Sequence, residues 1–270
     1  MNDAPFGPGP FLIAGPCVLE DERLNLTVAE RLARVAERLG IAVTYKASFD
    51  KANRSRLRGA RGPGLEEGLR ALAKVRETSG LPVLTDVHEP DQAVLAAAVV
   101  DVIQIPAFLC RQTDLLLAAG RTGCPVNVKK GQWMSAEEMA GALEKVRRGG
   151  TTAVAVTERG TFFGYGDLVV DMRNFARLRA ACGAPVIFDA THSVQQPGKG
   201  EDGASGGLRE HIPALLLAAA AAGADGFFLE THPDPAHAPS DGPTMIPLLQ
   251  LEDLVERTLE VWHAARRDRP

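Results

Sequence analysis

Eight short apolar runs in this chain each end in a polar or reactive side chain. The terminal residues are Cys17, Lys46, Asp86, Gln104, Lys129, Arg159, His192 and Glu230. A buried strand ends where its sheet meets water, so reactive groups at that end eight times over indicate one site built from many loops. Thiol, amine, guanidinium, imidazole and carboxylate groups bind anions, hold metal ions or transfer protons.

Cations are concentrated at or just after the ends of these runs. They are Lys46, Lys51, Arg54, Lys129, Lys130 and Arg159. Any one of them would most simply pair with a neighbouring carboxylate, but like charges held together are unfavourable without an anionic ligand. Arginine binds phosphate and carboxylate through two parallel hydrogen bonds. The sequence therefore predicts phosphorylated small-molecule substrates. The glycine-rich phosphate motifs of nucleotide-triphosphate and dinucleotide sites are absent from it.

A second constellation has the donor types of a metal site. It consists of Cys17, His192, Glu230 and Asp241, and the first, seventh and eighth strands that carry most of it become neighbours when a barrel closes. The alternatives are a buried cysteine that fills space and a histidine that acts as a general base. The mixed sulfur, nitrogen and oxygen set fits a divalent metal ion and leaves Fe²⁺, Zn²⁺, Mn²⁺ and Co²⁺ open. We expect the other candidate histidines, His88, His232 and His237, to form hydrogen bonds or face solvent.

Helical and apolar segments alternate along the whole chain. Helices are predicted at residues 24–39, 65–78, 90–99, 113–120, from the Ser135–Glu138 capping box to Gly149, and at 172–181, 212–222 and 251–264. Strands are predicted at residues 11–14, 42–46, 83–85, 102–105, 126–129, 153–157, 186–189 and 226–229. Apolar strands separated by helices form a parallel sheet covered on its outer face. Eight such units predict an α/β fold, a single-domain (β/α)₈ TIM barrel over residues 1–270. Three segments, 48–64, 157–168 and 192–209, are expected to be long polar loops at its catalytic face.

Composition limits the partners and the compartment. The chain has 270 residues, 45% of them hydrophobic, which is enough for a large core. A formal net charge of −4 makes nucleic acid an unexpected partner. The N-terminal segment lacks the basic and apolar regions of a signal peptide, and no apolar run is long enough to span a bilayer, so no membrane association is expected. Four cysteines without CxxC spacing are typical of a reducing cytoplasm.

Longer motifs in the chain resemble those of one enzyme family. IAGPC, YKASFDKANRS, TDVHE, IQIPAFLCRQTDLL, VNVKKGQ, DATHSVQ, SGGLRE and FLETHPDP are similar, in this order and over nearly the whole chain, to motifs of 3-deoxy-D-manno-octulosonate-8-phosphate synthases. The resemblance implies a (β/α)₈ barrel, commonly tetrameric. It also implies condensation of phosphoenolpyruvate with D-arabinose 5-phosphate and water, releasing inorganic phosphate, in lipopolysaccharide precursor biosynthesis.

The resemblance also implies roles for individual residues. The phosphoenolpyruvate group would comprise Lys46, Lys51, Lys129 and Arg159, with Gln104 and the Pro106–Ala107 backbone beside them. The aldose group would comprise Asn53, Arg54 and Ser55 at the phosphate and Ser48 and Asp86 at the hydroxyls. Arg111 would reach the aldose phosphate of a neighbouring subunit in a homotetramer. His192, Asp86 and Lys51 are the expected catalytic residues.

The same resemblance bears on the metal. Metal-independent members of the family carry Asn where this chain has Cys17, so the chain resembles the metal-dependent type. In that type Cys17, His192, Glu230 and Asp241 match the metal ligands.

Three other functions remain open on the residues. A 3-deoxy-D-arabino-heptulosonate-7-phosphate synthase would use erythrose 4-phosphate, but its loop typically reads KPRTS where this chain has KANRS. A Schiff-base aldolase would use Lys129 or Lys46 as its nucleophile. A barrel that has lost its chemistry would bind phosphate ligands or metal without turnover.

Overall fold

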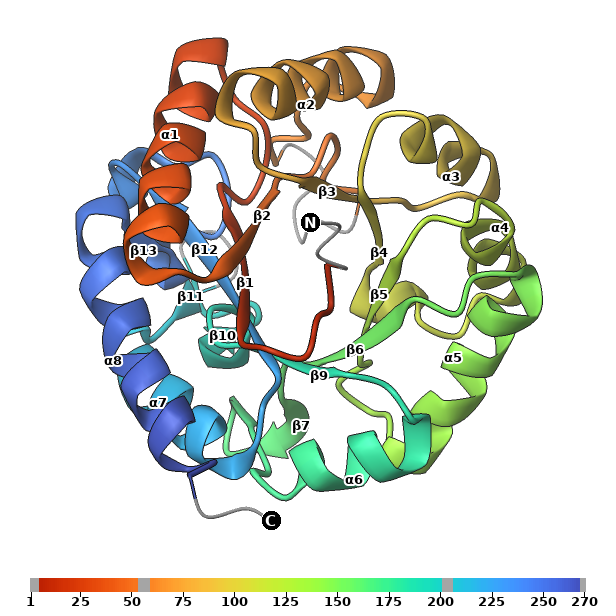
Figure 1. Ribbon diagram of the computed structural model, residues 1–270, viewed down its shortest axis with the longest axis vertical. Helices are drawn as coiled ribbons and strands as arrows, with labels where there is room; N and C mark the ends of the chain where they lie inside the picture. Colours follow the sequence, from red (N-terminus) through yellow and green to blue (C-terminus); the bar gives the residue numbers. More distant parts are fainter. Residues whose placement is uncertain (1–4, 53–58, 201–205, 268–270) are drawn as a thin grey trace.

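The strands of this protein close into a parallel barrel (Figure 1). The computed structural model describes residues 5–52, 59–200 and 206–267. The barrel strands are β1 (Phe11–Gly15), β2 (Ala42–Lys46), β3 (Val83–Asp86), β4 (Val102–Ile105), β5 (Val126–Lys129), β6 (Val154–Glu158), β9 (Val186–Asp189) and β12 (Gly226–His232). Each pairs in parallel with the next, and β1 pairs with β12 to complete the ring. The predicted (β/α)₈ TIM barrel is confirmed.

A helix follows each barrel strand and lies on the outside of the ring (Figure 1). The helices are α1 (Glu22–Leu39), α2 (Leu65–Ser79), α3 (Pro90–Ala97), α4 (Thr113–Arg121), α5 (Ala136–Gly149), α6 (Asn174–Cys182), α7 (Ile212–Ala222) and α8 (Leu251–Ala264). The predicted capping box begins α5: Ser135 accepts from the Glu138 amide, and Glu138 accepts from the Ser135 amide. Gly40, left-handed at φ 62°, ends α1 as predicted.

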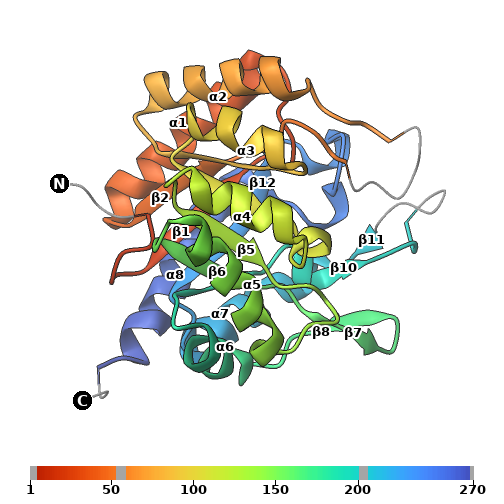
Figure 2. The ribbon, with the colours of Figure 1, turned by 90° about the vertical axis from the view of Figure 1, so that its right-hand side faces the viewer.

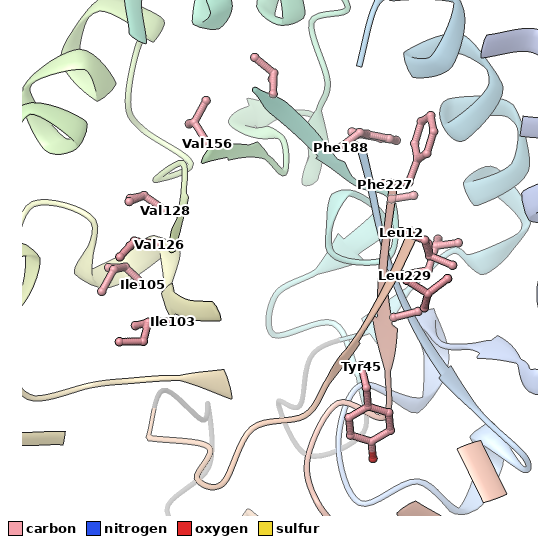
Figure 3. Packing of buried hydrophobic residues seen from close by; sticks show 14 of the residues in the cluster. Leu12, Tyr45, Ile103, Ile105, Val126, Val128, Val156, Phe188, Phe227 and Leu229 are labelled. Carbon is pink, nitrogen blue, oxygen red and sulfur yellow. The ribbon is translucent and has the colours of Figure 1, made fainter. Parts of the chain in front are cut away.

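Side chains alternate between the inside and the outside of the barrel along its strands, and two apolar clusters result. Phe11 and Ile13 of β1 point into a cluster inside the barrel, while Leu12 and Ala14 join the larger cluster beneath the helices. The labelled members of the outer cluster, Phe188 and Val128 among them, point away from the barrel axis (Figure 3). The inner apolar layer fills the barrel floor, so the inward positions further along each strand are free to carry polar groups.

Two of the expected loops contain short antiparallel hairpins. β7 (Thr161–Gly164) pairs with β8 (Asp167–Val169), and β10 (Gln195–Gln196) pairs with β11 (Gly206–Gly207). Both extend from the same end of the barrel (Figure 2). A further short strand, β13 (Ile246–Pro247), pairs with the end of β12. The long polar loops expected over 157–168 and 192–209 thus contain short strands that the sequence did not reveal, because strands of two to four residues are too short to show alternation.

Candidate active site

A cavity of about 1460 Å³ opens at the carboxyl ends of the barrel strands. Most of the sequence-predicted site residues line it: Lys46, Ser48, Lys51, Asp86, Gln104, Pro106, Ala107, Lys129, Arg159, His192 and Asp241. They come from seven of the barrel strands or the segments that follow them. Of the eight strand-end residues named from the sequence, all but the fully buried Cys17 and Glu230 line this one cavity. Asn53, Arg54 and Ser55 lie outside the described residues.

Lys46 connects the cationic side of the site to the predicted metal ligands. Its Nζ donates to Oε1 of Glu230 at 2.9 Å and to the backbone oxygen of Cys17 at 3.0 Å. Lys46 and Glu230 are both buried. Burial alone would raise the pKa of Glu230, but Lys46 and His192 outweigh it and hold that pKa at about 2. Glu230 is therefore an anion at neutral pH.

Three of the four predicted metal ligands converge closely. One ligand atom each from Cys17, Glu230 and Asp241 lies within 4.8 Å of the others, and Sγ of Cys17 is 3.1 Å from Oδ2 of Asp241. The fourth, His192, has Nε2 at 3.6 Å from Oε2 of Glu230 and 3.9 Å from Oδ2 of Asp241. Burial and the nearby carboxylates raise the pKa of the Cys17 thiol. Lys46 already pairs with one oxygen of Glu230, and a cation between the thiol and the two carboxylates would offset the repulsion among them.

An unpartnered buried oxygen supports the fit to a metal ion. Oε2 of Glu230 has no hydrogen-bond partner among the described residues, although the side chain is fully buried. A buried carboxylate oxygen without a partner is destabilising, and coordination to a cation would satisfy it. The soft and hard donors together fit the divalent transition metals, so the residues present are suitable ligands.

Asp189 was missed by the sequence reasoning and occupies a central position. Its Oδ2 lies 2.7 Å from Nδ1 of His192 and also accepts a hydrogen bond from Nζ of Lys129. Burial would raise the pKa of Asp189, but His192 and Lys129 hold it well below the ordinary value. The apolar run PVIFD ends on Asp189 itself, so the strand-end rule could have found it.

A polar chain lines the side of the cavity formed by β2 and β3. Oγ of Ser48 donates to Oδ1 of Asp86 at 2.5 Å, and Nζ of Lys51 lies 3.1 Å from Oγ of Ser48. His88 Nε2 lies 3.1 Å from the other oxygen of Asp86. Burial opposes ionisation of Asp86, yet His88, Lys46 and Lys51 lower its pKa well below the ordinary value. The predicted hydroxyl-binding residues Ser48 and Asp86 therefore lie together, with Asp86 ionised.

Arg159 and Lys129 form the opposite, cationic side of the cavity. Nη2 of Arg159 donates to Oε1 of Gln195 at 2.7 Å, while its buried Nη1 has no partner among the described residues. Lys129 lies over the ring of Phe228, and burial lowers its pKa. A buried guanidinium nitrogen without an acceptor is suited to an anionic ligand. Gln195 and Arg209, which also line the cavity, were missed by the sequence reasoning.

Two cations named in the sequence analysis, Lys130 from its position and Arg111 from the family resemblance, do not line the cavity of their own chain. Lys130 follows Lys129 by one residue and points outward from the barrel, where Nζ lies 3.5 Å from Oε1 of buried Glu158. Counting it with the site cations was wrong, because side chains alternate along a strand. Arg111 is exposed and is not part of the cavity lining.

The three other candidate histidines behave as expected. His88 bonds Asp86, buried His232 lies 3.1 Å from Glu20, and exposed His237 pairs with Asp234.

The fold and the site together are those of a barrel enzyme with a cation-lined cavity at the carboxyl ends of its strands. The sequence model of the DAHP synthetase I family matches residues 6–265. A 2-dehydro-3-deoxyphosphooctonate aldolase of Rhodopseudomonas palustris is 56% identical over 256 residues, covering 95% of this chain and 89% of the relative. A protein of the same name from Nitrobacter hamburgensis is 56% identical, covering 92% and 86%. Another, from a Bradyrhizobium species, is 54% identical, covering 96% and 88%. The chain therefore belongs to the DAHP synthetase I family, alongside its 2-dehydro-3-deoxyphosphooctonate aldolases.

Proposed function

We propose that this enzyme condenses phosphoenolpyruvate with D-arabinose 5-phosphate and water to give 3-deoxy-D-manno-octulosonate 8-phosphate and inorganic phosphate, a step towards lipopolysaccharide. The observation that carries the proposal is the single cavity lined both by the cations Lys46, Lys129 and Arg159 and by Ser48 and Asp86. The cations suit an enol phosphate carrying a carboxylate, and the hydroxyl and carboxylate suit a polyhydroxy aldehyde. The name shared by the relatives supports this reaction.

The chemistry forms one carbon–carbon bond and one carbon–oxygen bond from water, and it breaks the carbon–oxygen bond to phosphate. C3 of phosphoenolpyruvate attacks the aldehyde carbon, positive character develops at C2, water adds there, and phosphate leaves by C–O cleavage. Lys46, Lys51, Lys129 and Arg159 hold the phosphate and carboxylate, with Gln104 and the Pro106–Ala107 backbone beside them. These contacts fix the reacting carbons in proximity and offset the repulsion between two anionic substrates.

The aldose is placed by the other side of the cavity. Ser48 and Asp86 bind its hydroxyls, and Asn53, Arg54 and Ser55 bind its phosphate. The catalytic residues are His192, Asp86 and Lys51, with His192 and Asp86 as the groups that move protons. The ionised state of Asp86, which the nearby cations favour, supports a role as acceptor.

The enzyme belongs, in this proposal, to the metal-dependent type. Cys17, His192, Glu230 and Asp241 would hold a divalent ion, with Fe²⁺, Zn²⁺, Mn²⁺ and Co²⁺ all compatible with the donor set. A bound ion of this kind polarises an oxygen ligand or lowers the pKa of a bound water.

The assembly and compartment are further parts of the proposal. We expect a homotetramer in which exposed Arg111 contacts the aldose phosphate of a neighbouring subunit. A cytoplasmic location is supported by the free thiols of Cys17, Cys110, Cys124 and Cys182. No helix within the described ranges combines the length and apolar character required to cross a membrane.

A phosphate-release assay tests the reaction. Arabinose 5-phosphate and erythrose 4-phosphate are offered side by side, before and after exhaustive chelation, and metal content is followed by elemental analysis. We expect release with arabinose 5-phosphate only, loss on chelation and recovery on adding metal. A preference for erythrose 4-phosphate would make the enzyme a heptulosonate phosphate synthase. Full activity in metal-free protein would contradict the metal assignment. Covalent trapping by borohydride in the presence of substrate would instead identify a Schiff-base aldolase.

A further inference from the structure

We infer that Gln195 couples anion binding at Arg159 to metal binding at Asp241, so that phosphoenolpyruvate tightens the metal site through this side chain. The inference rests on the proposed function and adds a positioning residue to it. Gln195 is buried at 9% exposure and lies between the two subsites.

Gln195 accepts a hydrogen bond from one subsite and donates one to the other. Its Oε1 accepts from Nη2 of Arg159 at 2.7 Å, and its Nε2 donates to Oδ1 of Asp241 at 2.8 Å. A guanidinium only donates and a carboxylate only accepts, so these two partners fix which end of the amide faces which group. A carboxylate here could not donate to Asp241, and a lysine could not accept from Arg159. Only a side chain with both functions spans the gap.

The two oxygens of Asp241 have different partners. Oδ1 accepts from Gln195, whereas Oδ2 lies 3.1 Å from Sγ of Cys17 and 3.9 Å from Nε2 of His192. The hydrogen bond from Gln195 therefore turns Oδ2 towards the other proposed metal ligands. Loss of that bond would leave the carboxylate oriented only through its contact with Cys17.

The backbone around this link is closely packed. Gln195 of β10 pairs with Gly207 of β11. A Cβ atom on Gly207 would lie 2.1 Å from Cγ2 of Thr244, so glycine permits the approach of the two segments. Thr244 in turn donates its amide to the backbone oxygen of Asp241 at 3.0 Å. The segments after β9 and β12 are thus held together where Gln195 meets Asp241.

Coupling follows from Nη1 of Arg159, which has no hydrogen-bond partner within the described parts of the chain. An anion bound at its buried Nη1 would immobilise the guanidinium, and with it the amide of Gln195 and the carboxylate of Asp241. The entropy cost of ordering Asp241 would then already have been met before the metal binds, so the metal would bind more tightly. Such coupling is reciprocal, so the metal must tighten phosphoenolpyruvate by the same factor.

The experiment measures Co²⁺ affinity in metal-stripped enzyme, with and without phosphoenolpyruvate and without aldose, so no turnover occurs. The thiolate-to-cobalt absorption of a Cys17-bound ion is the readout. In the wild type we expect phosphoenolpyruvate to tighten Co²⁺ binding about tenfold, within the usual range of such couplings. Direct attraction between the anion and the cation persists in every variant, so the comparison is between coupling factors.

Gln195→Met keeps the side-chain length and removes both hydrogen bonds, and Gln195→Asn keeps an amide that is too short to span the gap. Both are expected to reduce the coupling to about threefold or less. Gln196→Met is the matched control, because the neighbouring Gln196 bonds Asp167 of β8 instead. It should retain the wild-type factor.

The outcomes separate the inference from the proposed function. If both Gln195 variants bind Co²⁺ and phosphoenolpyruvate with the wild-type coupling factor, the inference is overturned and the proposed function stands. The same holds if phosphoenolpyruvate leaves the wild-type Co²⁺ affinity unchanged. Absence of any cobalt–thiolate signal in the wild type overturns the metal assignment and the inference with it.

Discussion

Nδ1 of His192 lies 2.7 Å from Oδ2 of Asp189, and this contact directs the other ring nitrogen towards Glu230 and Asp241. The same carboxylate oxygen accepts from Lys129. One buried anion therefore orients a proposed metal ligand and a proposed substrate-binding cation. Carboxylates that bond a metal-binding histidine fix its tautomer and increase its basicity.

Replacing Asp189 with Asn should weaken metal binding about 10- to 100-fold, because the neutral amide no longer fixes the His192 tautomer. Competition with a chromophoric chelator measures this affinity. Asp225→Asn is the control, since Asp225 accepts from the Val186 amide at the other end of the same strand. If both variants lost the same metal affinity, the cause would be a disturbance of β9 as a whole and not the loss of the contact with His192.

The sequence predicted the barrel and most of the cavity because each barrel strand is a short apolar run and the residue that ends the run marks the cavity edge. β1 and β12 pair with Gly15 opposite Glu230, which places Cys17 and Glu230 together as barrel closure required. Helix bounds were predicted to within two residues, since capping residues such as Ser135 and Gly40 mark them directly.

The remaining parts of the site depend on which face of a strand a residue occupies. Lys129 and Lys130 are adjacent in sequence, yet the first faces the cavity and the second faces outward to Glu158. The sequence reasoning took His192 as the functional residue at the end of β9, so it did not name Asp189, three residues earlier. Gln195 owes its position to the β10–β11 hairpin, whose strands span two residues each and leave no periodic signal.

Arg159 is expected to contact phosphoenolpyruvate and not the aldose. Arg159→Lys retains the charge but has one nitrogen in place of the guanidinium's Nη1 and Nη2, so it should lower kcat/KM for phosphoenolpyruvate about 10- to 100-fold, the loss expected for one charged hydrogen bond. The KM for arabinose 5-phosphate should change little. Steady-state kinetics with each substrate varied in turn provide the measurement, and Arg177→Lys on the exposed face of α6 is the control. A larger change in the aldose KM would place Arg159 at the other subsite.

The buried pair of Lys130 and Glu158 should be important for stability. Glu158 also accepts from the Gly160 amide and from Asn174, so the pair joins the ends of β5 and β6 to the first residue of α6. Lys130→Met leaves the carboxylate buried without its cation and should lower the free energy of unfolding by about 3–5 kcal/mol.

A double-mutant cycle in urea denaturation measures the interaction within this pair. The variant Lys130→Met/Glu158→Leu removes both charges and should recover much of the loss seen with Lys130→Met. Strictly additive losses would show that the two side chains contribute independently.

The contact between His88 and Asp86 should make stability depend on pH. Burial lowers the pKa of His88, but Asp86 outweighs it and raises that pKa above its ordinary 6.5, while the pKa of Asp86 falls below 3.8. The raised His88 pKa stabilises the fold below pH 6.5, and this contribution is lost as pH rises through the folded-state value. The lowered Asp86 pKa stabilises above pH 3.8, and this contribution is lost as pH falls through the folded-state value. Both contributions are therefore present between these two limits.

Comparing His88→Gln with the wild type by urea denaturation across pH tests this window. The free energy of unfolding should differ by about 1.5–3 kcal/mol near pH 5, as for a hydrogen bond between charged groups, and by less as His88 loses its proton at higher pH. His237→Gln is the control: the His237–Asp234 pair is exposed, and exposed ion pairs add little. A difference for His88→Gln that stays constant from pH 5 to pH 9 would mean that its packing against Phe49, at 5.6 Å between ring centroids, outweighs its charge.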